Sequence, residues 1–184
     1  KSMIKIFRLI CMWVLLPLSV VSCSDFLDIT PDGQVKKDEL LSTPEGVEDA
    51  LYGAYSSLRS KPLYGRELSI SSLEVMAQYL DCYGSDGVTA LSNYKYEDTR
   101  VKSVFEAVWA EMYKNISNVN AIIHCDLVAG ATGYPGTVYK GEALGLRAFM
   151  HFDLLRLFTE QITLNPSAKG IPYEAGKVYY SSGD

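Results

Sequence analysis

The chain has 184 residues, 48% of them hydrophobic, and a formal net charge of −5 at pH 7. An acidic chain repels nucleic-acid phosphates and anionic lipid headgroups, which argues against a nucleic-acid-binding protein and against an electrostatic membrane anchor. With two histidines and no CxxC spacing among its four cysteines, the sequence also gives no zinc site.

Residues 1–22 have the organisation of a bacterial lipoprotein signal peptide. Three cations lead into an apolar run over residues 9–21, and a small residue then precedes Cys23. The run is about 13 residues long, whereas a membrane-spanning helix needs roughly 20. A cleaved export signal fits this pattern; the alternative, a buried helix of a cytosolic fold, gains nothing from a cationic start. We expect cleavage before Cys23 and acylation of its thiol, and loss of the three cations takes the formal charge to −8.

Residues 23–42 are predicted to be a lipidated tether. The stretch that follows Cys23 is polar, contains Pro31 and Gly33, and has a few apolar residues between them. Such a segment is typical of extended chain that docks onto a folded body through its apolar side chains.

Two cysteines, Cys82 and Cys125, belong to the folded part of the exported chain. An exported protein can oxidise such a pair to a disulfide. Alternatively, the two are separate buried thiols that act as small hydrophobic residues. The sequence leaves both possibilities open.

The first helix is predicted to begin at Thr43, which offers a capping hydroxyl, followed by Pro44 and Glu45 at positions that favour a helix start. Apolar residues then recur with helical spacing and predict one buried stripe. The stripe consists of Val47, Leu51, Ala54, Tyr55 and Leu58. Lys61 and Pro62 end the helix.

A second, weaker helix is expected over residues 69–83, with Leu73, Met76, Ala77 and Leu80 on one side. Residues 84–98 contain Gly, Ser, Asp and Asn without periodicity and predict a loop.

The third and fourth helices are expected over residues 101–128 and 138–159. The third keeps a 3.6-residue apolar period over seven turns without Gly or Pro. The fourth is apolar around much of its circumference, which indicates burial between neighbours. One apolar seam consists of Leu144, Ala148, Phe152, Leu155 and Phe158, and another flank carries Leu146, Phe149 and Leu157. A short Gly-rich connection makes the two helices antiparallel.

The fold class predicted from these elements is mostly α, with helices stacked in pairs as in a solenoid. Two pairs are fewer than a free-standing solenoid usually needs. We therefore expect further chain beyond Asp184, and apolar helix surface that this further chain covers.

Several segments together resemble the N-terminal part of the SusD/RagB family of bacterial surface nutrient-binding lipoproteins. They agree with the family in order and separation over residues 23–173. They are CSDFLD at 23–28 followed by Pro31, TPEGVEDALYGAY at 43–55, the spaced Trp109, Tyr113, Ile116 and Asn120, GEALGLRAFMHFDLLRLF at 141–158 and KGIPY at 169–173. The family usually has Gly where this chain has Thr159, and its members run to several hundred residues.

The resemblance implies a tetratricopeptide-like helical scaffold over residues 43–184, truncated relative to the family. It also implies a lipid anchor on the outer face of the outer membrane and a TonB-dependent, SusC-like transporter as partner. A protein of this kind captures an oligosaccharide or polysaccharide for uptake, or a peptide in RagB-type members. The alternative from another class is a helical protein-interaction module that binds no glycan.

The predicted glycan-binding residues lie in the loop of residues 84–98 and next to it. Aromatic rings stack on the C–H faces of sugars, and polar side chains bind sugar hydroxyls. The resemblance places some of the family's glycan contacts in the loop after the second helix. The candidates are Tyr83, Asp86, Asn93, Tyr94 and Tyr96. Each tyrosine can instead pack back onto the scaffold with its hydroxyl bonded.

No catalytic motif is found, so the chain is predicted not to be an enzyme and to need no cofactor. His124, Cys125 and Asp126 are consecutive, and adjacent helical residues point about 100 degrees apart, which prevents a base–nucleophile hydrogen bond among them. The sequence has no G-x-S-x-G, P-loop or H-E-x-x-H motif either.

Overall fold

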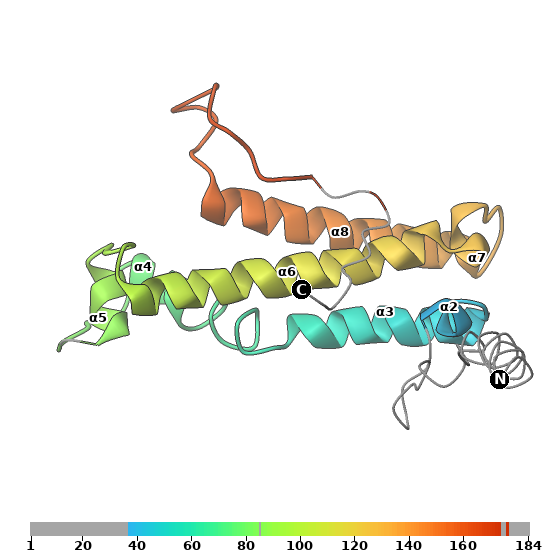
Figure 1. The fold of residues 1–184 in the computed structure, drawn as a ribbon, viewed down its shortest axis with the longest axis horizontal. Helices are drawn as coiled ribbons and strands as arrows, with labels where there is room; N and C mark the ends of the chain where they lie inside the picture. The colour runs from blue at the N-terminus through green and yellow to red at the C-terminus, as the bar shows by residue number, and fades with distance from the viewer. Residues whose placement is uncertain (1–36, 85, 174–175, 177–184) are drawn as a thin grey trace, which may run out of the picture. The chain divides into compact units, whose positions relative to one another are not determined.

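Three long helices, α3 (Pro44–Leu58), α6 (Thr99–His124) and α8 (Gly136–Phe158), form the body of the protein (Figure 1). The computed structural model describes residues 37–84, 86–173 and 176, all within the compact unit that begins at Lys37. The predicted signal peptide, Cys23 and the first part of the predicted tether lie outside the described residues. The described part of the chain contains helices and no strands, which confirms the mostly α fold class.

Four short helices complete the described elements: α2 (Lys37–Leu40), α4 (Ser72–Met76), α5 (Gly87–Ser92) and α7 (Asp126–Ala129). α4 and α5 lie together at the end of the bundle where α6 begins, whereas α2 and α7 lie toward its other end (Figure 1). Residues 37–42, which the sequence assigned to the end of the tether, thus include α2 and the buried Leu41.

α3 begins as predicted. The Thr43 side chain accepts a hydrogen bond from the Gly46 amide at 3.1 Å, and Pro44 occupies the first turn. Gly46 is required there because a β-carbon at this position would overlap the Leu40 carbonyl group. Of the predicted stripe, Tyr55 is the exception: it is 43% exposed, since it lies at the border of the face that α6 and α8 cover.

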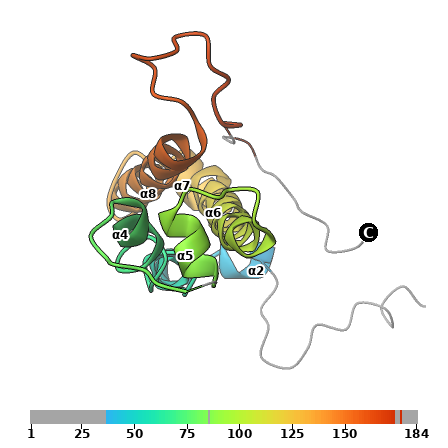
Figure 2. The same cartoon turned by 90° about the vertical axis from the view of Figure 1, so that its left-hand side faces the viewer.

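The main core lies between α3, α6 and α8. The three helices contact one another, and α6 runs antiparallel to both α3 and α8, as the colour progression in Figure 1 and the end view in Figure 2 show. Each large apolar side chain fully buried here contributes about 1.5 to 3 kcal/mol. The main core includes the buried residues Val47, Leu51, Val108, Met112, Ile116, Val119, Ala143, Met150 and Leu154.

Two predictions about helix extent were wrong. The helix expected over residues 69–83 is reduced to the five residues of α4, and Leu80 is exposed. The loop expected over residues 84–98 contains α5, whose first turn is capped by Asp86. A small second core of Val75, Ala90, Leu91 and Val101 joins α4, α5 and the start of α6, and this packing outweighs the weak local pattern.

The third predicted helix is divided. α6 ends at His124, and Cys125 takes an extended conformation with ψ 152°, after which α7 begins. Cys125 is buried and Cys82 is half-buried, and no disulfide joins the two in the structure.

The burial predicted for both apolar sides of the fourth helix was wrong for most of one side. The buried residues of α8 are Ala143, Leu146, Met150, His151 and Leu154, whereas Leu144, Ala148, Phe152 and Leu155 are exposed. Both sides of α8 are apolar, so the sequence pattern alone does not select the side that faces α3 and α6.

Candidate functional site

The candidate site is a groove lined by aromatic side chains between the first half of α6 and the end of α8. It encloses a cavity of about 770 Å³. We call it the aromatic groove. Its lining comprises Met76, Tyr96, Phe105, Trp109, Leu157 and Phe158 as apolar members, and Lys102, Glu106, Thr159 and Glu160 as polar members.

Helical spacing on α6 places much of this lining. Lys102, Phe105, Glu106 and Trp109 follow one another at intervals of three, one and three residues, which puts them on one side of the helix. The end of α8 supplies Phe158, whose ring makes edge-on contacts with Phe105 and Trp109 at centroid distances of 6.1 and 4.9 Å. These contacts fix the rings in place, so the groove is preformed.

Tyr96 extends this aromatic surface toward α5. Its ring is 6.3 Å from that of Phe105 and 6.3 Å from that of Tyr94. Partial burial, with a smaller contribution from Tyr94, raises the pKa of Tyr96 above its ordinary value. The Tyr96 hydroxyl therefore stays protonated at neutral pH and can both donate and accept a hydrogen bond.

The polar lining is acidic on balance. The Lys102 ammonium donates to a Glu97 carboxylate oxygen at 2.6 Å, and this hydrogen bond lowers the pKa of Glu97 and raises that of Lys102. A Glu160 carboxylate oxygen accepts from the Asn165 amide at 2.8 Å. Carboxylates in these positions can accept hydrogen bonds from hydroxyl groups of a ligand.

A second cavity of about 550 Å³ adjoins the aromatic groove and shares Thr159 and Glu160 with it. It lies between the end of α8 and residues 161–170. The two cavities together provide room for a ligand of more than one ring.

The row of aromatic rings continues from the groove along α6. Trp109 contacts Tyr113 at 4.8 Å between centroids, and the hydroxyl of Tyr113 donates to the Pro172 carbonyl at 2.7 Å. Tyr173 in turn lies 4.7 Å from the ring of His151. The segment around Pro172 is thereby held against α6 and α8.

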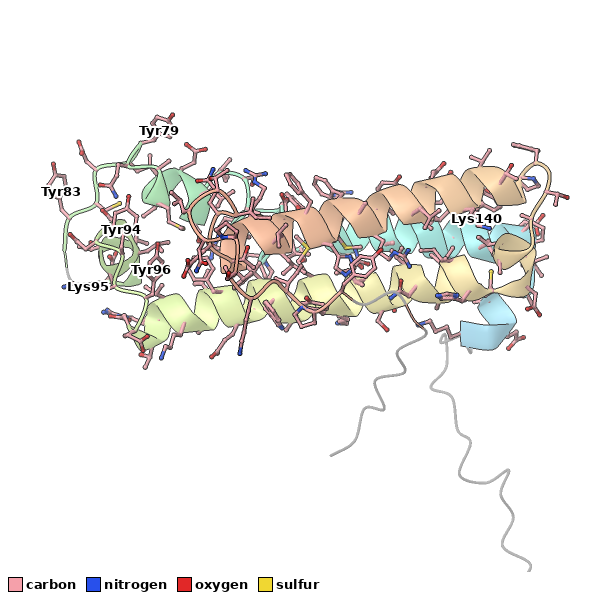
Figure 3. The ribbon with its side chains drawn as sticks, turned by 90° about the horizontal axis from the view of Figure 1, so that it is seen from above. Tyr79, Tyr83, Tyr94, Lys95, Tyr96 and Lys140 are labelled. Atoms are coloured by element: carbon pink, nitrogen blue, oxygen red, sulfur yellow. The ribbon has the colours of Figure 1, made fainter. Side chains whose placement is uncertain are left out.

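The five residues predicted to bind a glycan are placed in different ways. Figure 3 shows Tyr83, Tyr94 and Tyr96 at the end of the bundle formed by α4 and α5. Tyr96 lines the aromatic groove, and Tyr94 is next to it, with its hydroxyl donating to the Met76 carbonyl at 2.8 Å. Tyr83 is 85% exposed and is not among the residues that line the groove.

Asp86 and Asn93 flank α5. An Asp86 carboxylate oxygen accepts from the Thr89 amide at 2.9 Å, which lowers the pKa of Asp86. The side-chain amide of Asn93 donates to the Thr89 carbonyl at 2.8 Å. Both side chains thus already stabilise the ends of α5, the helix that precedes Tyr94 and Tyr96.

Sequence reasoning missed Phe105, Trp109 and Phe158 as site residues. It assigned all three to helix seams, because an apolar residue at helical spacing is most often a core residue. The available signal was their aromatic character, since rings that line a surface cavity are typical of ligand sites.

Among the described residues, no group of three or more His, Cys, Asp and Glu side chains is placed to hold a metal ion. No helix in the described ranges is both long and apolar enough to span a bilayer.

A family model described as "Starch-binding associating with outer membrane" matches residues 25–180. The chain is similar to "SusD-like protein P2" of Formosa agariphila, with 26% identity over 151 residues, which are 79% of this chain and 29% of that protein. The chain thus matches less than a third of the length of this relative. No solved structure matches the chain at a significant level.

Proposed function

The chain belongs to the SusD/RagB family, whose model matches residues 25–180, and from this premise we propose that it binds a glycan in the aromatic groove. The observation that supports the proposal most directly is the preformed cavity beside Tyr96, lined by three further aromatic rings and by carboxylates. Aromatic faces accommodate the C–H faces of a sugar ring, and the carboxylates accept hydrogen bonds from its hydroxyl groups.

Within this proposal, Tyr96 contacts the ligand directly and Tyr94 supports it. Asp86 and Asn93 act by holding α5, and Tyr83 provides an outlying contact for a longer ligand. Trp109 and Phe158 form the deeper wall of the site. The rings of Tyr94 and Tyr96 are 49% and 46% exposed, so a ligand has access to them from solvent.

The setting of this activity is also a proposal. The family description associates its members with the outer membrane. We infer for this protein acylation of Cys23, attachment to the outer leaflet with the helical body outside the cell, and delivery of the captured oligosaccharide or polysaccharide to a TonB-dependent, SusC-like transporter. The acidic charge of the chain is compatible with a lipid anchor, which needs no electrostatic attraction to headgroups.

The test is isothermal titration of the mature protein, at the length its gene encodes, with maltoheptaose and a panel of soluble polysaccharides. For a glycan that binds, Tyr96→Ala should lower the affinity about two- to tenfold, since one aromatic contact contributes about 0.5 to 1.5 kcal/mol. Tyr96→Phe keeps the ring and should lower it much less. Tyr134→Ala is the matched control, because Tyr134 is 88% exposed and lines a different cavity.

If Tyr96→Ala binds such a glycan with unchanged affinity, the aromatic groove is not the glycan-binding site. Failure of every glycan to bind, with retained affinity for the transporter, would favour the alternative of a helical protein-interaction module. The observation on the side of that alternative is the exposed apolar side of α8.

A further inference from the structure

A cavity of about 420 Å³ lies at the end of the bundle opposite to α4 and α5, where α7 ends and α3 and α8 begin (Figure 1). We call it the α7–α8 cavity. The connection between α7 and α8, residues 130–136, forms much of its wall, and Pro44, Asp126, Leu127 and Tyr139 complete it. It shares no lining residue with the aromatic groove, so the two are separate sites.

Two tyrosine rings line the α7–α8 cavity. Tyr139 is half-buried and packs against the main core, whereas Tyr134 is 88% exposed and contributes little to the fold. Tyrosine is enriched at the surfaces where proteins bind one another, and the face of its ring attracts cations. The rings therefore suit a ligand that carries a positive charge.

The charge around the α7–α8 cavity is negative. Asp126 lines the cavity, and Glu45 and Glu48 lie in the first turns of α3. Glu142 follows Tyr139 by one turn on α8. Partial burial raises the pKa of Tyr139, and the three nearby glutamates raise it further. Four carboxylates thus surround the two rings.

The neighbouring cations do not balance this charge. Neither α3 nor residues 126–139 contain a lysine or an arginine. The Lys140 ammonium donates to the Ala129 carbonyl at 2.9 Å, at the end of α7, and the Lys37 ammonium donates to the Asn118 side-chain oxygen of α6 at 3.5 Å. Both ammonium groups are bound elsewhere, and an excess of negative charge is left for a cation that a ligand supplies.

An arginine side chain fits this combination better than a lysine. The guanidinium is planar, so it can stack on a tyrosine ring and also donate two parallel hydrogen bonds to a carboxylate. An ammonium is a compact and more strongly hydrated charge, which gains less from a ring. The volume lies at the lower end of the range for ligand sites, about 300 to 1,000 Å³, and is suited to one long side chain.

We propose that the α7–α8 cavity binds an arginine side chain of a partner protein, whose guanidinium stacks on the Tyr134 ring and pairs with the Asp126 carboxylate. Charge complementarity favours this occupant over a neutral sugar, which makes no use of the excess negative charge. The exposure of Tyr134 favours a protein over a small free amine, because the partner's backbone can cover a ring that a small amine leaves in water. The proposal does not depend on glycan binding in the aromatic groove.

The test is a fluorescence-anisotropy titration of the mature protein, at the length its gene encodes, with a capped, dye-labelled glycine peptide that carries arginine. Tyr134→Ala and Asp126→Asn should each lower the affinity about two- to fivefold, as expected for loss of one exposed cation–π contact or ion pair. Tyr134→Phe keeps the ring and should bind nearly as the wild type does. Tyr79→Ala is the matched control, since Tyr79 is 78% exposed at the opposite end of the bundle (Figure 3).

Reference ligands and salt separate this site from other kinds of binding. The affinity should fall as the ionic strength rises, and a peptide with citrulline, the uncharged analogue of arginine, should bind much more weakly. Unchanged affinity in both variants, equal binding of the citrulline peptide or failure of the arginine peptide to bind would overturn the proposal. Equally tight binding of a lysine peptide would overturn the choice of arginine, and equally tight binding of agmatine would overturn the choice of a protein partner. The variants should keep the wild-type free energy of unfolding, which shows that the loss is local.

Discussion

Glu67 is a carboxylate that the fold keeps charged although it is only 5% exposed. Burial alone would raise its pKa, but hydrogen bonds from the Ser72 hydroxyl, at 2.6 Å, and from Arg66 outweigh this effect and leave the pKa below its ordinary value. The carboxylate lies between the end of α3 and the start of α4 and therefore fixes the geometry of that turn.

The stability of the protein should consequently fall in acid through Glu67. A group whose pKa is lowered by folding contributes stability that is fully present above its ordinary pKa of 4.5 and is lost as the pH falls through its folded-state pKa. Between pH 7 and pH 3, the free energy of unfolding measured in urea should therefore fall more for the wild type than for Glu67→Gln. Equal losses for the two proteins would show that Glu67 is not a source of the acid sensitivity.

Individual residues of the candidate site were predictable to different degrees. Tyr94 and Tyr96 stood out because aromatic residues in a polar, aperiodic segment suggest exposure. The spacing of Phe105 and Trp109 could not identify them, because helical spacing is the same whether the ring meets the core or a cavity; only their aromatic character pointed toward a ligand site. The position of the end of α8, which places Phe158 against both rings, shows that these rings face a cavity and not only the core.

At the scale of the helix, the start of α3 depends on Thr43. Its side chain satisfies the Gly46 amide, which otherwise has no partner within the helix. Thr43→Ala should lower the free energy of unfolding by about 1 kcal/mol. Ser56→Ala, an exposed position in the same helix, is the control and should change the stability little.

Chemical denaturation of the two variants beside the wild type measures this difference. A loss in Ser56→Ala as large as that in Thr43→Ala would mean that the effect does not come from the cap.

The sequence predicted long helices better than short ones. α3, α6 and α8 have strong periodic patterns, and their observed limits lie within a few residues of the expected ones, except at Cys125. α5 was missed because six residues that include Gly87, Thr89 and Ser92 carry little periodic signal, and their helix is stabilised by Asp86 and by packing on Val101. The exposure of one side of α8 was missed because both of its sides are apolar, and burial of each side depends on the neighbouring helices.

At the scale of the whole described unit, two apolar clusters of unequal size stabilise the fold. The larger cluster has twenty buried residues, most of them on α3, α6 and α8, whereas the smaller joins α4, α5 and the start of α6 through four. Regions with few buried apolar contacts open at a lower free-energy cost than the main core.

Native-state amide hydrogen exchange should therefore distinguish the two clusters. Amides in the middle of α6, around Met112 and Ile116, should exchange most slowly, and those of α4 and α5 should exchange much faster. Equal protection of both regions would show that the body unfolds as one cooperative unit. Addition of a glycan that occupies the aromatic groove should slow exchange in α5, because the Tyr96 segment would then be held by the ligand.

The position of Lys37 has a consequence for how the protein meets a large carbohydrate. The Lys37 ammonium donates to the Asn118 side-chain oxygen at 3.5 Å, and Asn118 is about 20 Å along α6 from Phe105 in the groove. Lys37 lies fourteen positions after Cys23, a span of at most about 50 Å. If Cys23 carries the fatty chains, the lipidated tether joins the bundle at Lys37, and this position and the opening of the aromatic groove lie at different places along α6. A stiff polysaccharide then has room to lie across the opening of the groove without contacting the point where the tether joins the bundle.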